Sequence, residues 1–157
     1  MEGNFWPRIA VLGAGAVGCY FGGMLARAGA SVTLIGRPPH VGALSRNGLF
    51  FDGLHFQQQI AVSASTQVSA VRDAEIVLFC VKTLDTEEAA KSLAPHLAPG
   101  AAVISLQNGV DNVERIRSTA KIDARSRRLC GCRHDRAGAR EAFRARRSHP
   151  RGSARAR

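Results

Sequence analysis

Residues 9–18 read IAVLGAGAVG, and this stretch decides the fold. Ile9–Leu12 is a short, wholly apolar run, which is typical of a strand buried on both faces of a parallel sheet. Three glycines follow it, Gly13, Gly15 and Gly18, in the spacing G-x-G-x-x-G. A strand that ends in such a turn predicts that a helix begins immediately after it.

Apolar residues at three- and four-residue spacing continue beyond the glycines and predict that helix. They are Val17, Phe21, Met24, Leu25 and Ala28, and we expect them to form its inner face. Gly29 lies where a helix is commonly capped, and Gly22 and Gly23 are expected to serve packing. Ser31–Ile35 is a second β-rich run, so the segment 9–35 predicts a βαβ unit of roughly 30 residues.

In this context the glycines predict a dinucleotide-binding turn. One glycine allows the tight turn, the second lets the backbone approach a pyrophosphate, and the third allows the helix to pack closely on the strand. The pyrophosphate would lie at the helix N-terminus, where free backbone N–H groups attract an anion. The candidate cofactor-binding residues are Gly13, Ala14, Gly15, Ala16, Val17 and Gly18. The alternative is that the glycines serve packing alone.

The end of the second strand indicates which dinucleotide is bound. An NAD site usually carries an acidic residue there, which holds the ribose 2′-hydroxyl. No acidic residue occurs between Glu2 and Asp52, and Arg37 stands at the expected position. A guanidinium can hold a 2′-phosphate through charge-assisted hydrogen bonds, so we expect NADP(H) rather than NAD(H). The alternative is an ordinary solvated arginine.

Strands and helices alternate again further along the chain. The segment 38–66 is rich in turn residues and contains two alternating runs, 48–51 and 57–62, that could pair as a hairpin. Beyond it we expect a strand at 75–81, a helix at 85–97, a strand at 101–106 and a helix at 110–118 with Val113 and Ile116 inside. This pattern predicts an α/β, Rossmann-type, doubly wound parallel sheet over residues 1–124.

Two polar residues follow predicted strands at the edge where open α/β sheets bind ligands. Lys82 follows the strand 75–81, and Asn108 follows the strand 101–106. A lysine or an Asn-Gly turn alone is ordinarily just surface or loop. The convergence of several such loops on one edge is a better indication of a site than any one of them.

The motifs together resemble the N-terminal domain of the ketopantoate reductase (2-dehydropantoate 2-reductase) family. The resemblance covers residues 8–118 and is carried by the glycine turn, Arg37, Val81-Lys82-Thr83 with Asp85-Thr86, and the run LQNGV at 106–110. It implies reduction of ketopantoate, a small 2-oxo acid, by NADPH in the pathway to pantothenate and coenzyme A. It also implies that Lys82 and Asn108 lie beside the nicotinamide and substrate, with Gln107 near the cofactor.

The remaining residues, 125–157, differ sharply in composition. They hold twelve arginines and two acidic residues, which accounts for the whole net charge of +10. Because these residues show no hydrophobic periodicity, we expect them to form an aberrant, disordered tail. One hypothesis is a one-base frameshift between residues 118 and 127. The family's helical C-terminal domain, with its lysine proton donor and substrate-binding glutamate, would then be absent and the sheet truncated, so we expect weak or no catalysis.

Other readings of the chain remain open. Cys130-x-Cys132-x-His134 is too tightly spaced for a usual zinc site, and we expect no metal. The basic tail could bind nucleic acid, but only without specificity and with strong weakening by salt. The chain could also be an NADP-binding fragment without activity. Neither a signal peptide nor a membrane span is expected, and the cysteine pattern favours the cytoplasm; the oligomeric state is not predicted.

Overall fold

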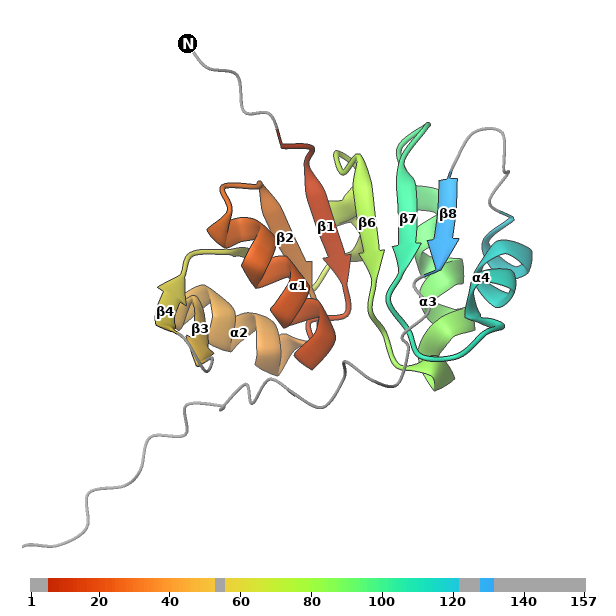
Figure 1. The fold of residues 1–157 in the computed structure, drawn as a ribbon. Coiled ribbons are helices and arrows are strands. Elements are labelled where there is room, and N and C mark those ends of the chain that lie inside the picture. The colour runs from red at the N-terminus through yellow and green to blue at the C-terminus, as the bar shows by residue number, and fades with distance from the viewer. Residues whose placement is uncertain (1–5, 53–55, 122–127, 132–157) are drawn as a thin grey trace, which may run out of the picture.

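A six-stranded, fully parallel sheet forms the centre of the molecule, in the order β5-β2-β1-β6-β7-β8 (Figure 1). The structure, a computed structural model, describes residues 6–52, 56–121 and 128–131. The strands are β1 (Ile9–Leu12), β2 (Val32–Ile35), β5 (Ser63–Ser65), β6 (Ile76–Phe79), β7 (Ala102–Ser105) and β8 (Arg128–Gly131). The order and the parallel pairing confirm the predicted Rossmann-type α/β class.

Helices cover both faces of this sheet. One face carries α1 (Ala16–Arg27) and α2 (Pro38–Asn47), together with a small antiparallel hairpin of β3 (Leu49–Asp52) and β4 (Gln57–Ile60). The other carries α3 (Thr86–Leu93) and α4 (Asn112–Ala120). Three short 3-10 helices complete the described part: η1 (Val68–Val71), η2 (Thr83–Asp85) and η3 (Ala94–His96).

Successive residues of β1 serve the two faces in turn, because side chains alternate along a strand. Ala10 and Leu12 belong to the buried cluster that contains Leu93 and Ile116 of α3 and α4. Val11, which is fully buried, belongs to the cluster on the α1 side. The continuous apolar run at 9–12 is therefore explained by burial on both faces.

The inner face of α1 agrees only in part with the expected one: Phe21, Met24 and Leu25 pack against the core but are only partly buried. Its buried residues are Gly18, Cys19, Gly22 and Gly23, whereas Val17 is 42% exposed. An added Cβ at Gly22 would lie 2.8 Å from Leu34 Cδ2. The helix approaches the sheet so closely that small residues face it, and larger apolar residues lie at its sides; the expected packing role of the two inner glycines is confirmed.

The hairpin at β3 and β4 is confirmed, but the preceding helix α2 was not predicted. Two prolines and Gly42 give the segment 38–47 the composition of a loop. Pro38 is tolerated because it stands at the first helical position, where no backbone N–H is needed. Only Leu44 of this helix is buried, so its apolar periodicity is too weak to identify it.

The structure contradicts part of the expectation for residues 125–157. Arg128–Gly131 form β8, which pairs with β7 in parallel from Ala102↔Arg128 to Ser105↔Gly131. The backbone of an edge strand offers N–H and C=O groups to any extended segment, so this pairing requires no side-chain periodicity. The rest of the expected disordered tail, 125–127 and 132–157, lies outside the described residues.

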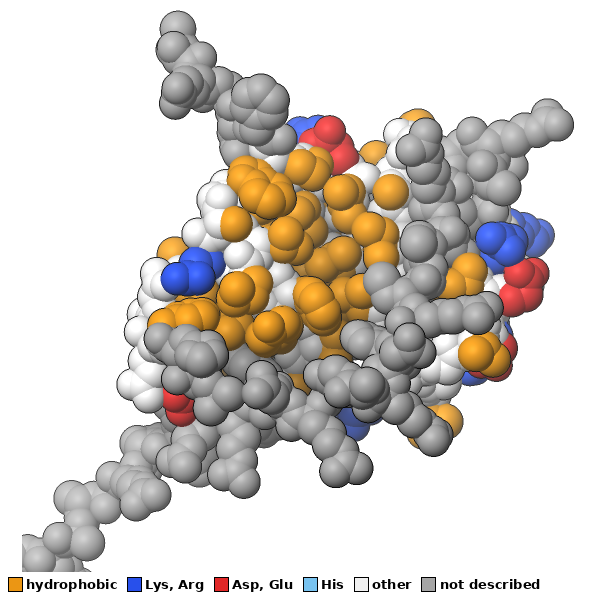
Figure 2. Space-filling model, viewed as in Figure 1, with side chains coloured by type: hydrophobic (Ala, Val, Ile, Leu, Met, Phe, Trp, Pro, Cys, Tyr) orange, Lys and Arg blue, Asp and Glu red, His pale blue; other side chains and the backbone are white. Residues whose placement is uncertain are grey.

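One face of the molecule is rich in hydrophobic side chains. Figure 2 shows them gathered across the side on which α1 lies. On β6 and β7, Ile76 and Ile104 pack against the cluster on this side and are only half-buried. Among the described residues, no helix combines the length and apolarity required to cross a membrane.

Candidate functional site

The glycine-rich turn lies between the ends of β2 and β6. The carbonyl oxygen of Ile35 accepts hydrogen bonds from the N–H groups of Gly13 (2.9 Å) and Ala14 (3.0 Å). Gly13 has φ +109°, and a Cβ there would lie 2.7 Å from the backbone carbon of Cys80. At Gly18 a Cβ would collide with the Gly13 carbonyl oxygen. Both positions therefore require glycine, for conformation at the first and for close packing at the second.

Gly15, in contrast, faces open space. It is the N-cap of α1, and no atom lies within 4 Å of where its Cβ would be. The first intrahelical hydrogen bond runs from Cys19 N–H to Gly15 C=O (2.8 Å), so the N–H groups of residues 16–18 have no intrahelical partner. No side chain caps this end, and no acidic residue lies in its first turn. The turn thus fits a pyrophosphate, because it offers free donors, space and the positive end of a helix dipole.

Arg37 lies at the carboxyl end of β2, beside this turn. The pairing of Leu12 with Ile35 aligns the ends of β1 and β2, and Arg37 follows two residues later as the N-cap of α2. Its side chain is exposed, and it forms no ion pair with another described residue. A cation at this point is available to an anionic ligand that extends from the turn towards β2.

Lys82 and Asn108 lie on the other side of the turn, after β6 and β7. Leu106 N–H donates to the Phe79 carbonyl (3.0 Å), which keeps the ends of these two strands together. Both candidate residues are exposed. The structure therefore brings Arg37, the glycine turn, Lys82 and Asn108 to one edge of the sheet, as the sequence predicted.

Gln107 differs from Arg37, Lys82 and Asn108, because it is buried, with 6% exposure. Its Nε2 donates to the Val81 carbonyl (3.0 Å) and to Thr86 Oγ1 (2.8 Å), and its Oε1 accepts from Ser105 Oγ (3.2 Å). Thr86 and Ser105 are also buried; from the sequence, Thr86 was identified only as part of the motif that carries the resemblance, and Ser105 not at all. A polar residue inside a helical period or at a strand end gives no signal of its long-range partner.

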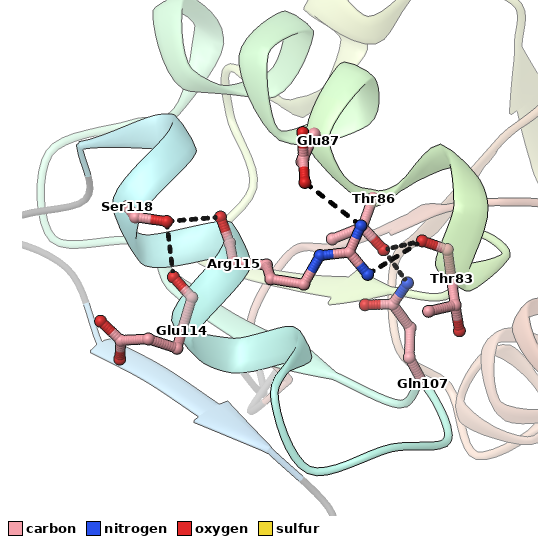
Figure 3. Close-up of polar contacts among 7 residues, drawn as sticks. All are labelled: Thr83, Thr86, Glu87, Gln107, Glu114, Arg115 and Ser118. Carbon is pink, nitrogen blue, oxygen red and sulfur yellow. Dashed lines mark hydrogen bonds and ion pairs between the residues drawn. The ribbon is translucent and has the colours of Figure 1, made fainter.

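Helix α4 supports the loop after β6 from outside. Figure 3 shows the Arg115 side chain reaching towards Thr83 and Glu87. Its Nη1 donates to the Thr83 carbonyl (3.4 Å), and its Nη2 lies 3.2 Å from Glu87 Oε1. These contacts are partly exposed, so their contribution to stability is small.

Two cysteines lie beside the glycine turn, and both are poor nucleophiles. Burial raises the pKa of the Cys19 thiol to about 11. Burial, with a smaller contribution from Cys19, raises the pKa of Cys80 to about 12. Neutral thiols neither attack substrates nor bind metals well. The described residues contain no cluster of three potential metal ligands; Cys132 and His134 of the tight motif lie outside them.

The fold and the glycine-rich turn define a class: Rossmann-type proteins that bind a dinucleotide at the carboxyl edge of a parallel sheet. Within that class, residues 9–153 match the family model described as "Ketopantoate reductase PanE/ApbA", and the chain belongs to this family of nicotinamide-dinucleotide-dependent reductases. The match extends well beyond residue 118, where the resemblance seen in the sequence ends.

Individual relatives support this assignment. The chain is 42% identical to 2-dehydropantoate 2-reductase of Pyrococcus abyssi over 109 residues, which are 69% of this chain and 35% of that protein. The crystal structure of a PanE/ApbA family ketopantoate reductase from Ralstonia eutropha superposes with a TM-score of 0.74 at 49% identity, covering 79% of this chain and 40% of the other. The chain is also similar to an enzyme with another name, glycerol-3-phosphate dehydrogenase [NAD(P)+] of Rhizobium etli, at 32% identity over 109 residues, or 66% of this chain and 33% of that protein. The chain spans about a third of the length of these curated relatives.

Proposed function

We propose that residues 1–124 form an NADPH-binding domain of an enzyme that reduces 2-dehydropantoate to pantoate, in the pathway to pantothenate and coenzyme A. The observation that carries this proposal is the arrangement along one sheet edge: an open glycine turn at the centre, a cation after β2, and Lys82 with Asn108 after β6 and β7. Relatives named 2-dehydropantoate 2-reductase support the substrate. A cytoplasmic location is proposed with it.

Different residues of this edge would hold different parts of the cofactor. The backbone of Gly13, Ala14, Gly15, Ala16, Val17 and Gly18 would hold the pyrophosphate. Arg37 would bind the 2′-phosphate of NADPH, since an exposed guanidinium forms strong bidentate bonds with phosphate. Lys82 and Asn108, on the opposite side of the turn, would lie beside the nicotinamide and the 2-oxo acid, where an ammonium and an amide can hold its carboxylate or carbonyl.

When bound, NADPH supplies a hydride to the substrate carbonyl carbon. The carbonyl oxygen then needs a proton, and a positioned acid has to provide it. Burial raises the pKa of both the Cys19 and the Cys80 thiol, so neither is suited to donate this proton near neutral pH. Lys82, on the β6 side of this edge, would stabilise the developing negative charge.

Titration of the purified full chain with NADPH and NADH, followed by the fluorescence of the reduced nicotinamide, tests the binding proposal. We expect NADPH to bind at least about tenfold more tightly, as one charge-assisted phosphate interaction contributes roughly 1.5–3 kcal/mol. If neither NADPH nor NADH binds, the binding proposal is refuted. Consumption of NADPH with ketopantoate then tests the reaction separately.

A second candidate function is dinucleotide binding without turnover. It would require only the open glycine turn at the N-terminus of α1 and the exposed Arg37, which suit a dinucleotide by themselves. NADPH binding with no ketopantoate-dependent oxidation would support it over the enzyme. Non-specific nucleic-acid binding concerns residues 125–157, most of which lie outside the described ranges, and no described contact favours it.

A further inference from the structure

The loops that carry Lys82 and Asn108 leave two neighbouring strands, and the backbone ladder between them ends before either residue. The last paired residues are Phe79 and Ser105, followed by the hydrogen bond from Leu106 N–H to Phe79 C=O. The next backbone N–H of the first loop, at Cys80, donates instead to β1. Side chains therefore have to join the loops beyond this point.

Gln107 makes that connection. Its amide NH₂ group donates to the Val81 carbonyl and to Thr86 Oγ1. The Thr86 hydroxyl donates onward to the Thr83 carbonyl at 2.9 Å, and Figure 3 shows the chain of contacts from Gln107 through Thr86 to Thr83. Ser105 Oγ donates to the amide oxygen. We call these five residues the Gln107 network.

The donors and acceptors of the Gln107 network allow only one orientation of the Gln107 amide. The Val81 carbonyl can only accept, so the NH₂ group of Gln107 has to face it. The single Thr86 proton goes to the Thr83 carbonyl, which leaves the Thr86 oxygen to accept from Gln107. Both amide protons and the amide oxygen are thus used inside the protein.

The network fixes the backbone around both candidate residues. Val81 and Thr83 flank Lys82, and Gln107 directly precedes Asn108. On the far side, Asn112 Nδ2 donates to the Asn108 carbonyl at 2.6 Å. Two exposed side chains are therefore supported by a buried frame.

We propose that Gln107 and Thr86 are positioning residues, which hold the backbone of Lys82 and Asn108 in place for the nicotinamide half of the dinucleotide. This deepens the proposed function and rests on it. It also changes the role expected for Gln107, from a cofactor contact to an internal support. The sheet order limits the effect to one end of the ligand, because Arg37 follows β2, on the opposite side of β1 from β6 and β7.

The substitution Thr86→Val tests this role, since valine keeps the shape but removes the hydroxyl. It breaks the bond to Thr83 and leaves one Gln107 proton without a partner. Thr86→Ser keeps the hydroxyl and serves as the conservative variant. Ile116→Val is the matched control, because it removes one methyl group from the fully buried core on the same side of the sheet.

Calorimetric titration of each full-length variant uses two ligands, NADPH and adenosine 2′,5′-bisphosphate, which lacks the nicotinamide half. For Thr86→Val we expect NADPH affinity to fall roughly three- to tenfold, the size of one lost hydrogen bond, with bisphosphate affinity unchanged. Thr86→Ser should restore NADPH affinity, and Ile116→Val should leave the ratio of the two affinities at its wild-type value.

Equal losses for both ligands, or no loss for either, would overturn the positioning role. A wild-type chain that binds neither ligand would instead refute the proposed function, so the two failures are distinguishable. If Thr86→Val does not fold, Ser105→Ala gives the same test from the other end of the amide. Ser105→Ala should weaken the binding of NADPH alone, by about twofold to threefold, because the bond it removes is longer (3.2 Å) than the bond between Gln107 and Thr86. An unchanged NADPH affinity would overturn the proposal.

Discussion

Replacing Gly15 with alanine should weaken dinucleotide binding while leaving the fold intact. An added Cβ at Gly15 meets no protein atom within 4 Å, and the backbone there, φ −90° and ψ −167°, is open to any residue. Alanine is a weaker N-cap by up to about 1 kcal/mol, and its lower freedom in the unfolded chain offsets about 0.4–1 kcal/mol of this. The melting temperature should therefore change by less than about 6 °C.

The same methyl group occupies the space that the pyrophosphate needs. Forcing an extra methyl into a close contact costs about 1–3 kcal/mol, which corresponds to a roughly fivefold to hundredfold weaker affinity for NADPH. The assay pairs fluorescence titration with thermal unfolding of the same samples. Gly42→Ala is the control, since its Cβ would contact only the flexible end of Arg46, at 3.4 Å. Wild-type affinity in Gly15→Ala would refute the placement of the pyrophosphate over this turn.

Three further predictions concern the cofactor end, the thiols and the core. Arg37→Ala should weaken NADPH binding roughly tenfold to a hundredfold and leave NADH binding unchanged, and an equal loss for both would exclude a 2′-phosphate contact. In the folded protein the pKa values of Cys19 and Cys80 are raised from 9.0 to about 11 and about 12. Above pH 9 these thiols ionise more readily in the unfolded chain than in the folded one, so their contribution to the free energy of unfolding is complete below pH 9 and declines as the pH rises through the folded-state pKa values. Unfolding free energies measured between pH 8 and pH 11 should fall in wild type and fall less in a Cys80→Ala variant; parallel curves would contradict this. Leu93→Ala, at a fully buried position, should cost about 2–5 kcal/mol in urea unfolding, and a loss below about 1 kcal/mol would show that the α3 side of the core is loosely packed.

Local patterns were sufficient to predict the central elements. The run Ile9–Leu12, the glycine turn and the second strand are contiguous, and each is identified by residues within a few positions of itself. The hairpin at β3 and β4 was found in the same way. The positions of Arg37, Lys82 and Asn108 followed from counting strand ends, because the carboxyl ends of parallel strands share one edge.

What the sequence could not show depends on contacts between distant residues. The Gln107 amide reaches Thr86 across 21 positions and Val81 across 26. Helix α2 was missed because only Leu44 of it is buried. Strand β8 was missed because it is held by backbone pairing with β7, which leaves no periodic pattern of side chains in the sequence. The inner face of α1 was predicted only in part, because the closeness of the helix to the sheet, which favours glycine and cysteine, is set by tertiary packing.

The central place of β1 in the sheet bears on how the chain folds. Its partner β6 is far along the chain, with Ile9 paired to Ile76, so the central strand pair cannot form until β6 has emerged from the ribosome. Until then one edge of a wholly apolar strand has no neighbour, and closing so long a loop is slow. Such an intermediate exposes an unpaired strand edge that is prone to aggregation. Cells that make this protein quickly, or at high temperature, should therefore lose part of it to aggregation during synthesis rather than after folding.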